Sequence, residues 1–384
     1  MKCIIYWLFC CLLAAPVYCQ HNIKAIDALL KTYYKDNEPG AFVLISRNNK
    51  TLFKNGYGIA NMQTGEKINS STNFNIGSIT KQFTAYCIVQ LAAKKQLLLQ
   101  DKIIQYFPDF NANTGNRVTI QQLLTHSSGM LDHYAFTDTS LVKHATDKDV
   151  LQAVKNIDST YFTPGTRYRY SNTAYCLLAL IIEKISGLSY HAYVKKNIFT
   201  PLFMQHAVVL QTGKPIYRQA YGYDYDSSQH TFRQLDAGES IFFSTEGDGG
   251  IYTSASEYLR WFQSLQQPLS ANKTVVQQCR SAQHLIDPLN RLSYGYGWFI
   301  SEKDSATAVY HTGSNGGFRA IVFTIPSQQY MVSIFSNRTG IDLEVLVQQI
   351  NGLLGVTNNS FTKVDTLVSF MDSSPNFAPC KETP

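Results

Sequence analysis

Charge is scarce in this sequence. Only 16% of its 384 residues are Asp, Glu, Lys or Arg, and the formal net charge is +6 without any run of Lys or Arg. A charge this small and this dispersed is typical of a solvated surface and not of a nucleic-acid interface, so we expect no nucleic-acid partner. Because 45% of the residues are apolar, the chain can bury a sizeable core and is predicted to be globular.

Cysteines with metal-binding or redox spacing are also lacking. Four of the eight cysteines lie in the first 19 residues, and the other four, Cys87, Cys176, Cys279 and Cys380, are far apart. No C-x-x-C occurs among these four, which excludes zinc ribbons and redox pairs, and we expect buried free thiols. The histidines are scattered, and neither H-E-x-x-H nor a paired-carboxylate spacing occurs. The sequence therefore predicts no metal and no cofactor.

One long apolar run stands at the N-terminus. Lys2 is followed by an apolar run over residues 3–15 and then by small and polar residues. This is the pattern of a secretory signal peptide, and cleavage after Cys19 would export the protein to the periplasm or the medium. Two alternatives stay open. A retained membrane helix is disfavoured because Pro16 comes too early, and a lipid anchor on Cys19 is disfavoured by the bulky Tyr18.

Strand patterns lie at both ends of the remaining chain, with helical patterns between them. Residues 41–60 indicate two strands around a polar R-N-N-K turn, and four apolar or alternating segments over 294–336 indicate further antiparallel strands. An apolar periodic segment over 342–354 predicts a closing helix. We therefore predict an α/β fold of the α+β type, with a central antiparallel sheet built from N- and C-terminal strands, flanked by helices and interrupted by a large, mostly helical insertion.

The strands and the insertion would form one interlocked domain over residues 20–355. We assign about 20–77 and 241–355 to a sheet lobe and about 78–240 to a helical lobe, and the tail over 356–384 has no clear period. A cleft between two such lobes is a natural place for a small-molecule site.

The segment N-I-G-S-I-T-K-Q-F-T places Ser78 three residues before Lys81 at the start of an apolar helix. Three residues advance 300° along a helix, so the two side chains lie one turn apart on the same face. A serine hydroxyl needs a base to become a good nucleophile, and Lys81 can be that base if desolvation or a second cation lowers its pKa. Cys87 is rotated by half a turn and belongs to the core. Taken alone, the spacing favours an N-capping serine beside a solvated lysine over a catalytic pair.

Two further motifs follow in the chain. Y-S-N over residues 170–172 leads into an apolar helix, and H-T-G over residues 311–313 ends a strand. With S-x-x-K, they resemble in type and order the motifs of the penicillin-recognising serine hydrolases, in the branch of class C β-lactamases, DD-carboxypeptidases and related esterases. The phrases L-L-T-H-S-S-G-M, T-P-G-T-R-Y-R-Y-S-N and G-D-G-G-I-Y-T-S-A-S also match, and the resemblance covers about residues 40–337.

The resemblance implies a catalytic role for three side chains. Ser78 would be the acylated nucleophile, and Lys81 would be its proton acceptor or its electrostatic support. Tyr170 would pass the proton to the leaving group and would later activate water.

The resemblance also implies a set of substrate contacts. Asn172 would orient a substrate amide, and the strand that carries Thr312 would pair with an extended substrate backbone. Gly313 would let that backbone approach closely. The backbone N–H groups of Ser78 and Ser314 would form the oxyanion hole.

One position departs from the class C pattern, because His311 stands where class C β-lactamases usually have lysine. An imidazole of ordinary pKa is only partly charged at pH 7. If His311 binds a substrate carboxylate, we expect kcat/KM to fall as the pH rises through about 6 to 7. Histidine at this place shifts the expectation from a dedicated β-lactamase toward a D-amino-acid peptidase, an amidase or an esterase. Arg319 is either a substitute carboxylate binder or a surface arginine.

We therefore expect an exported, monomeric serine hydrolase that acts on small-molecule or peptide substrates through an acyl-enzyme. It would contact a membrane only through an uncleaved leader or a lipid anchor. The alternatives are a penicillin-binding protein without turnover, a carboxylesterase on the same fold, and a membrane-anchored interaction protein with vestigial motifs. β-Lactams, D-peptides and esters all stay open, because selectivity would lie in loops around residues 130–160 and 215–245.

Overall fold

The structure is a computed structural model that describes residues 22–133, 145–235, 244–269, 272–303 and 305–356. The expected signal peptide with its cleavage position at Cys19 lies outside the described residues. So does the tail from residue 357 onward.

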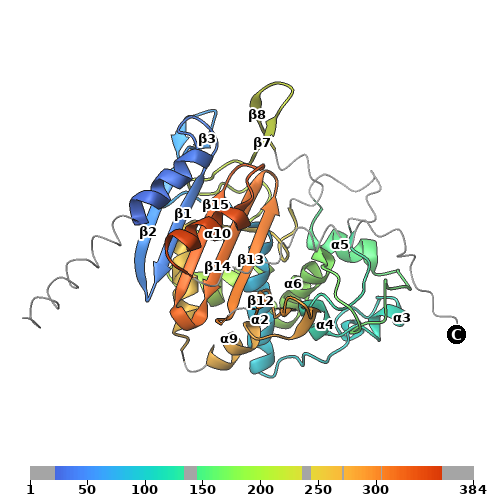
Figure 1. Cartoon of the computed structure of the whole chain (residues 1–384). Helices are drawn as coiled ribbons and strands as arrows, with labels where there is room; N and C mark the ends of the chain where they lie inside the picture. The colour runs from blue at the N-terminus through green and yellow to red at the C-terminus, as the bar shows by residue number, and fades with distance from the viewer. Residues whose placement is uncertain (1–21, 134–144, 236–243, 270–271, 304, 357–384) are drawn as a thin grey trace, which may run out of the picture.

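An eight-stranded antiparallel sheet forms the middle of the molecule (Figure 1). Its strand order is β10-β11-β12-β13-β14-β15-β1-β2. Strand β1 pairs with β15, with Ala41 opposite Ser336 and Arg47 opposite Tyr330, so the two ends of the chain share one sheet as the sequence predicted. The strands span Ala41–Arg47 (β1), Lys50–Tyr57 (β2), His284–Asp287 (β10), Leu292–Tyr294 (β11), Phe299–Ser301 (β12), Ala308–Asn315 (β13), Phe318–Ile325 (β14) and Tyr330–Ser336 (β15).

The first hairpin of the sheet forms where the sequence indicated it. Asn48 and Asn49 connect β1 to β2 with φ angles of 52° and 60°. Positive φ at both central residues is the signature of a type I′ hairpin turn, for which asparagine is well suited. The expected pair of strands around the R-N-N-K turn is confirmed.

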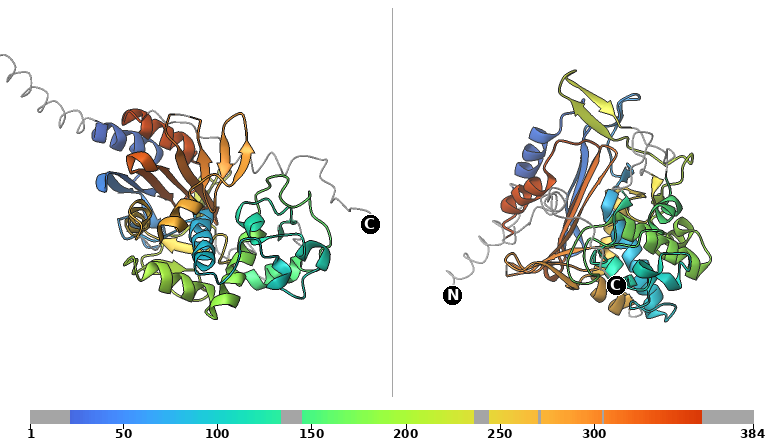
Figure 2. Two further views of the ribbon diagram at one scale, coloured as in Figure 1. Left: turned by 90° about the horizontal axis from the view of Figure 1, so that it is seen from below. Right: turned by 90° about the vertical axis from the view of Figure 1, so that its right-hand side faces the viewer.

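Helices cover both faces of the sheet (Figure 2). The helix over residues 22–33 and α10 (Leu343–Leu353) pack side by side on one face, where Leu30 and Leu346 are fully buried. The other face carries the helical insertion together with α8 (Ala255–Gln266) and α9 (Lys273–Cys279). The sheet is therefore the middle of three layers.

Helix α2 (Lys81–Ala93) is buried on nearly every side at the centre of the helical layer. Its neighbour α6 (Asn172–Ser186) is equally apolar, and the two form the core of the insertion.

Among the described residues, no single helix is long and apolar enough to cross a membrane, although Asn172–Ser186 and Tyr190–Phe199 reach that length together with a bend of 74°. The other elements are Ala112–Gly115 (α3), Ile120–Leu124 (α4), Asp147–Val154 (α5), Tyr190–Val194 (α7), Ile59–Asn61 (β3), Glu66–Lys67 (β4), Phe74–Asn75 (β5), Val208–Val209 (β6), Tyr223–Asp226 (β7), Thr231–Gln234 (β8), Ile251–Thr253 (β9) and the 3₁₀ turns η1 (Gly77–Thr80), η2 (Ile103–Gln105) and η7 (Pro326–Gln328), with the π-helical turn η4 (Lys195–Phe199).

Asn337, directly after β15, ties three distant parts of the chain together. Its Oδ1 accepts from the Gly40 N–H at 2.7 Å, and its Nδ2 donates to the carbonyls of Ile59, Ala60 and Tyr221 at 3.1, 3.2 and 2.9 Å. The Asn337 side chain is fully buried, so water cannot take over these hydrogen bonds if the side chain is removed. The junction therefore fixes the insertion to the sheet.

We expect Asn337→Ala to lower the free energy of unfolding by about 2 to 4 kcal/mol, because it leaves a buried N–H and buried carbonyls without partners. Urea unfolding measures the change. Gln63→Ala, at an exposed side chain, is the matched control and should cost less than about 0.5 kcal/mol. An Asn337→Ala loss as small as the control's would contradict the role of this junction.

Candidate active site

The nucleophile candidate and its base lie where a 3₁₀ turn becomes a helix. Ser78 belongs to η1, and Lys81 is the first residue of α2. The turn is shaped by Gly77, whose φ is +51° and whose N–H donates to Asn75 Oδ1 at 2.7 Å. Lys81 is fully buried, and its Nζ lies 3.1 Å from Ser78 Oγ, within hydrogen-bond distance. The contact predicted from the S-x-x-K spacing is present.

The Lys81 amine has two further partners, and both can only accept a hydrogen bond. Its Nζ lies 2.7 Å from Asn172 Oδ1 and 2.8 Å from the backbone carbonyl of Asp248. A neutral amine has two N–H bonds and one lone pair. If the two N–H bonds point at these carbonyl oxygens, the lone pair is left for the Ser78 hydroxyl. The charged amine fits the same three positions by donating to all of them, so a proton can move from Ser78 to Lys81 without rearrangement.

The start of α6 supplies Asn172. Ser171 is the N-cap residue and accepts from the Ala174 N–H at 3.2 Å, while Asp132 Oδ2 accepts from the Asn172 N–H at 2.7 Å. Two side chains thus satisfy the free N–H groups of this helix end. Because Ser171 performs the capping, the Asn172 amide is available for Lys81, and its Nδ2 remains as a donor for a substrate.

Tyr170 lies beside the amine through its ring. Lys81 Nζ is 4.9 Å from the centre of the Tyr170 ring, a cation–π distance. The Tyr170 hydroxyl is buried and has no hydrogen-bond partner among the described residues. The structure therefore places Tyr170 in the site, while its predicted proton transfer through the hydroxyl stays a prediction.

A second buried histidine, His126, was not identified as a site residue from the sequence. Its Nδ1 accepts from the Ser171 N–H at 3.1 Å, and its ring centre is 4.2 Å from that of Tyr170. Burial, with repulsion from Lys81, holds the pKa of His126 well below its usual range, so the imidazole is neutral. His126 therefore supports the Y-S-N segment. The phrase L-L-T-H-S-S-G-M contains His126 and matches the family, but it does not indicate the contact with Tyr170.

The environment of His311 corrects the charge expected from the sequence. The side chain is 1% exposed, with Nδ1 2.6 Å from the Thr312 carbonyl and Nε2 3.0 Å from the Tyr294 hydroxyl. The carbonyl can only accept, so Nδ1 carries the proton and Nε2 accepts from Tyr294. Burial, the largest cause, lowers the pKa of His311 to about 3, although the bond to Thr312 acts in the opposite direction. The imidazole is therefore neutral near pH 7, and an activity change through pH 6 to 7 is no longer expected from it.

The H-T-G strand has a free edge at the site. Among the described residues, β12 pairs only with Ala308–Tyr310 of β13, so residues 311–315 have a strand partner on the β14 side alone. A Cβ on Gly313 would lie 2.0 Å from the Ile76 carbonyl oxygen, and one on Gly77 would lie 2.6 Å from the Ser314 nitrogen. Only glycine permits this approach of the two backbones. It brings the Ser78 and Ser314 segments together, as the predicted oxyanion hole requires.

A cavity of about 350 Å³ borders the other side of this strand. Its lining includes Thr312, Gly313, Ser314 and Arg319, with Glu344 from α10 opposite. Arg319 Nη1 donates to Ser314 Oγ and, at 3.0 Å, to the Phe318 carbonyl. Arg319 is thus bound to the strand that was predicted to pair with substrate, while carboxylate binding by Arg319 stays a prediction.

The family is decided by a match over most of the chain, because the profile described as Beta-lactamase covers residues 23–351. The chain belongs to the beta-lactamase family. Members of this family are serine hydrolases, in agreement with the resemblance given by the three motifs.

The chain is similar in sequence to curated relatives and in fold to a solved structure. Protein flp of Staphylococcus aureus (strain COL) is 29% identical over 333 residues, which are 85% of this chain and 66% of that protein, so the chain spans just under two thirds of this relative's length. Penicillin-binding protein 4* of Bacillus subtilis (strain 168) is 29% identical over 331 residues, covering 83% and 72%. The octameric penicillin-binding protein homologue from Pyrococcus abyssi superposes with a TM-score of 0.74 at 25% identity, covering 88% and 77%. The predicted fold class is confirmed.

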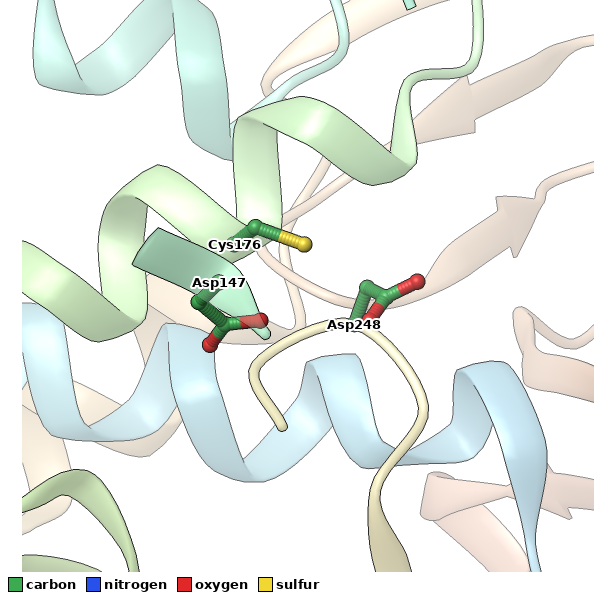
Figure 3. Close-up of side chains that lie close together, drawn as sticks. All are labelled: Asp147, Cys176 and Asp248. Carbon is green, nitrogen blue, oxygen red and sulfur yellow. The ribbon is translucent and has the colours of Figure 1, made fainter. Parts of the chain in front are cut away.

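Three buried side chains of this beta-lactamase-family protein lie close together, which the sequence did not predict: Asp147, Cys176 and Asp248 (Figure 3). Their oxygen and sulfur atoms lie within 4.8 Å of one another. Burial, with repulsion from Asp248, holds the pKa of Asp147 well above its usual range, and burial likewise raises the pKa of the Cys176 thiol. Cys176 is a buried free thiol, as are Cys87 and Cys279, which agrees with the sequence expectation.

Because the pKa of His311 is lowered in the folded protein, we predict that the wild-type protein loses stability relative to His311→Gln as the pH falls. The unfolded chain protonates this histidine below about pH 6.5, and the folded protein does not until the pH approaches about 3. Protonation thus favours the unfolded state in that window. Relative to His311→Gln, the wild-type protein should lose about 2 kcal/mol of unfolding free energy between pH 7 and pH 5. Urea unfolding of both proteins at these pH values measures it, and parallel pH curves would show that His311 titrates normally.

Proposed function

We propose that the protein is an exported serine hydrolase that cleaves amide or ester bonds through a covalent acyl-enzyme on Ser78. The observation that carries the proposal is the Lys81 amine, placed 3.1 Å from Ser78 Oγ with its two other positions taken by acceptor oxygens. A serine with an oriented base is the arrangement that nucleophilic catalysis needs.

Acylation would follow from this geometry. Ser78 Oγ bonds to the substrate carbonyl carbon while its proton passes to Lys81 Nζ. Negative charge develops on the carbonyl oxygen, where the N–H groups of Ser78 and Ser314 would stabilise it. As the carbonyl carbon loses its bond to nitrogen or oxygen, the leaving group takes the proton from Lys81, with Tyr170 as the relay.

Deacylation would reverse the same steps with water as the nucleophile. Water gives a proton to the Tyr170 and Lys81 pair and bonds to the acyl carbon, and Ser78 Oγ leaves with that proton. All the groups are side chains or backbone of this chain, so the proposed cycle uses no cofactor.

The proposed substrates are β-lactams, D-amino-acid peptides or esters. The relative named penicillin-binding protein 4* supports binding of the first class. The neutral His311 provides no cation for a substrate carboxylate, which disfavours a dedicated β-lactamase and supports an amidase or esterase. Asn172 and the free edge of β13 would bind the acyl side of an extended substrate. Location in the periplasm or the medium rests on the leader, and action as a monomer is part of the proposal.

A penicillin-binding protein without turnover is the second candidate, and one observation favours it. The Ser78–Lys81 hydrogen bond that starts acylation is already formed, whereas the Tyr170 hydroxyl, which would activate water, has no hydrogen-bond partner among the described residues. This candidate predicts one equivalent of acyl-enzyme and no product, whereas the hydrolase releases product continuously.

Labelling tests the proposal. We expect a fluorophosphonate probe or a fluorescent penicillin to modify Ser78, found by peptide mass mapping, and Ser78→Ala to remove the label. Ser228→Ala, at an exposed serine between β7 and β8, is the control and should still be labelled. Turnover of nitrocefin, a D-Ala-D-Ala peptide and p-nitrophenyl esters then separates the substrate classes. Absence of label with both probes, or label that survives Ser78→Ala, would refute the nucleophile.

A further inference from the structure

The loop over residues 246–250 supplies one of the two acceptors that orient the Lys81 amine, through the carbonyl of Asp248. Its sequence, E-G-D-G-G, contains three glycines, and it adopts a turn with no regular secondary structure. Glycine gives a backbone wide conformational freedom, so a loop of this composition needs external contacts to hold a carbonyl in place.

Asp147 makes the first such contact. It is the first residue of α5, and its two carboxyl oxygens accept from successive N–H groups of the loop, Oδ1 from Glu246 at 3.0 Å and Oδ2 from Gly247 at 3.1 Å. Asp147 is 6% exposed, so these bonds are shielded from water. The next residue after the bound pair is Asp248, whose carbonyl faces Lys81.

Thr84 makes the second contact from the opposite side. It lies one turn after Lys81 on α2, and its Oγ1 donates to the Gly247 carbonyl at 2.6 Å. The loop also lies close to α6, because a Cβ on Gly247 would be 2.4 Å from the Tyr175 carbonyl oxygen. The peptide groups before Asp248 are thus bound from α5 and α2 and lie against α6.

We propose that Asp147 and Thr84 are positioning residues for Lys81, and that they act by clamping the loop whose Asp248 carbonyl orients the amine toward Ser78. The inference rests on the proposed function, in which Lys81 takes the Ser78 proton. Neither residue touches the substrate in this proposal. Their removal should therefore slow the chemical step without weakening binding.

The chemistry at position 147 supports a carboxyl group. A carboxylate offers two acceptor oxygens, whereas an asparagine at the same place would turn its NH₂ toward one of the two N–H groups. Burying an acid is costly, and the raised pKa of Asp147 reflects that cost. The hydrogen bonds from the Glu246 and Gly247 N–H groups offset part of the cost of burying the Asp147 carboxyl group.

The same three groups, Asp147, Cys176 and Asp248, have the composition of a metal site (Figure 3). Two features favour a role in holding the loop over a role in metal binding. Both Asp147 oxygens already accept backbone N–H groups, and burial raises the pKa of the Cys176 thiol, which favours S–H over the thiolate that metals bind.

The test measures the inactivation kinetics of Ser78 with the fluorophosphonate probe, as the limiting rate kinact and the half-saturating concentration KI. We expect Asp147→Asn to lower kinact by about 10- to 100-fold with KI within about twofold of wild type, because a small misplacement of the base slows the chemical step. Thr84→Val should lower kinact in the same way, and Thr84→Ser, which keeps the hydroxyl, should recover most of the rate. Cys279→Ala is the matched control, since it removes another buried thiol of the helical layer, in α9, and leaves Asp147, Thr84 and the loop unchanged.

Thermal unfolding followed by circular dichroism shows which variants are folded, and if Asp147→Asn is not, Thr84→Val decides. Wild-type kinact in a folded Asp147→Asn and in Thr84→Val would overturn this inference alone, while Ser78 remains labelled. An equal loss in Cys279→Ala would also overturn it, because the general packing of the helical layer, and not the contacts of Asp147 and Thr84 with the loop, would then control the rate. A wild-type protein that is not labelled at Ser78 would overturn the proposed function and this inference together.

Discussion

Lys81 is fully buried, and a buried amine is tolerated only when oxygen atoms take the place of its hydration. The three oxygens come from three separate segments: Ser78 from the turn before α2, Asn172 from the start of α6, and Asp248 from a glycine-rich loop. The amine is therefore correctly surrounded only when the helical insertion is fully assembled. This makes the site a product of tertiary packing, although two of its members are neighbours in sequence.

The sheet contributes the other half of the site through its backbone. Strand β13 extends beyond β12 and leaves a free edge there, and the face of this extension at Gly313 lies against the turn that carries Ser78. Glycines at positions 77 and 313 allow the two backbones to approach more closely than any side chain would permit. Because β1 pairs with β15 and Asn337 joins both ends of the chain to the insertion, the position of this edge is fixed by the whole domain.

Local spacing and motif order predicted a large part of this arrangement. The Ser78 and Lys81 contact follows from helical periodicity, and the antiparallel sheet follows from alternating segments near both ends. The Y-S-N and H-T-G motifs could be placed in the site through their resemblance to a family. In each case the decisive information lies within a few residues of the motif.

What the sequence could not predict depends on partners far away in the chain. His311 was expected to be partly charged, but its neutral state comes from burial beside Tyr294. Nothing local to His126 reveals that it contacts Tyr170, and nothing local to Asp147 reveals that it binds a loop about a hundred residues later. These contacts are long-range packing, for which a single sequence has no periodic signal.

The central claim is that Lys81 acts as a base and not only as a positive charge, and Lys81→Arg compared with Lys81→Met tests it most directly. Arginine keeps the charge and the donors but cannot take a proton at neutral pH. The rate of Ser78 labelling by the fluorophosphonate probe is the measurement. If Lys81 is the base, both variants lose labelling to the same extent. Labelling near the wild-type rate in Lys81→Arg, with loss only in Lys81→Met, would contradict it.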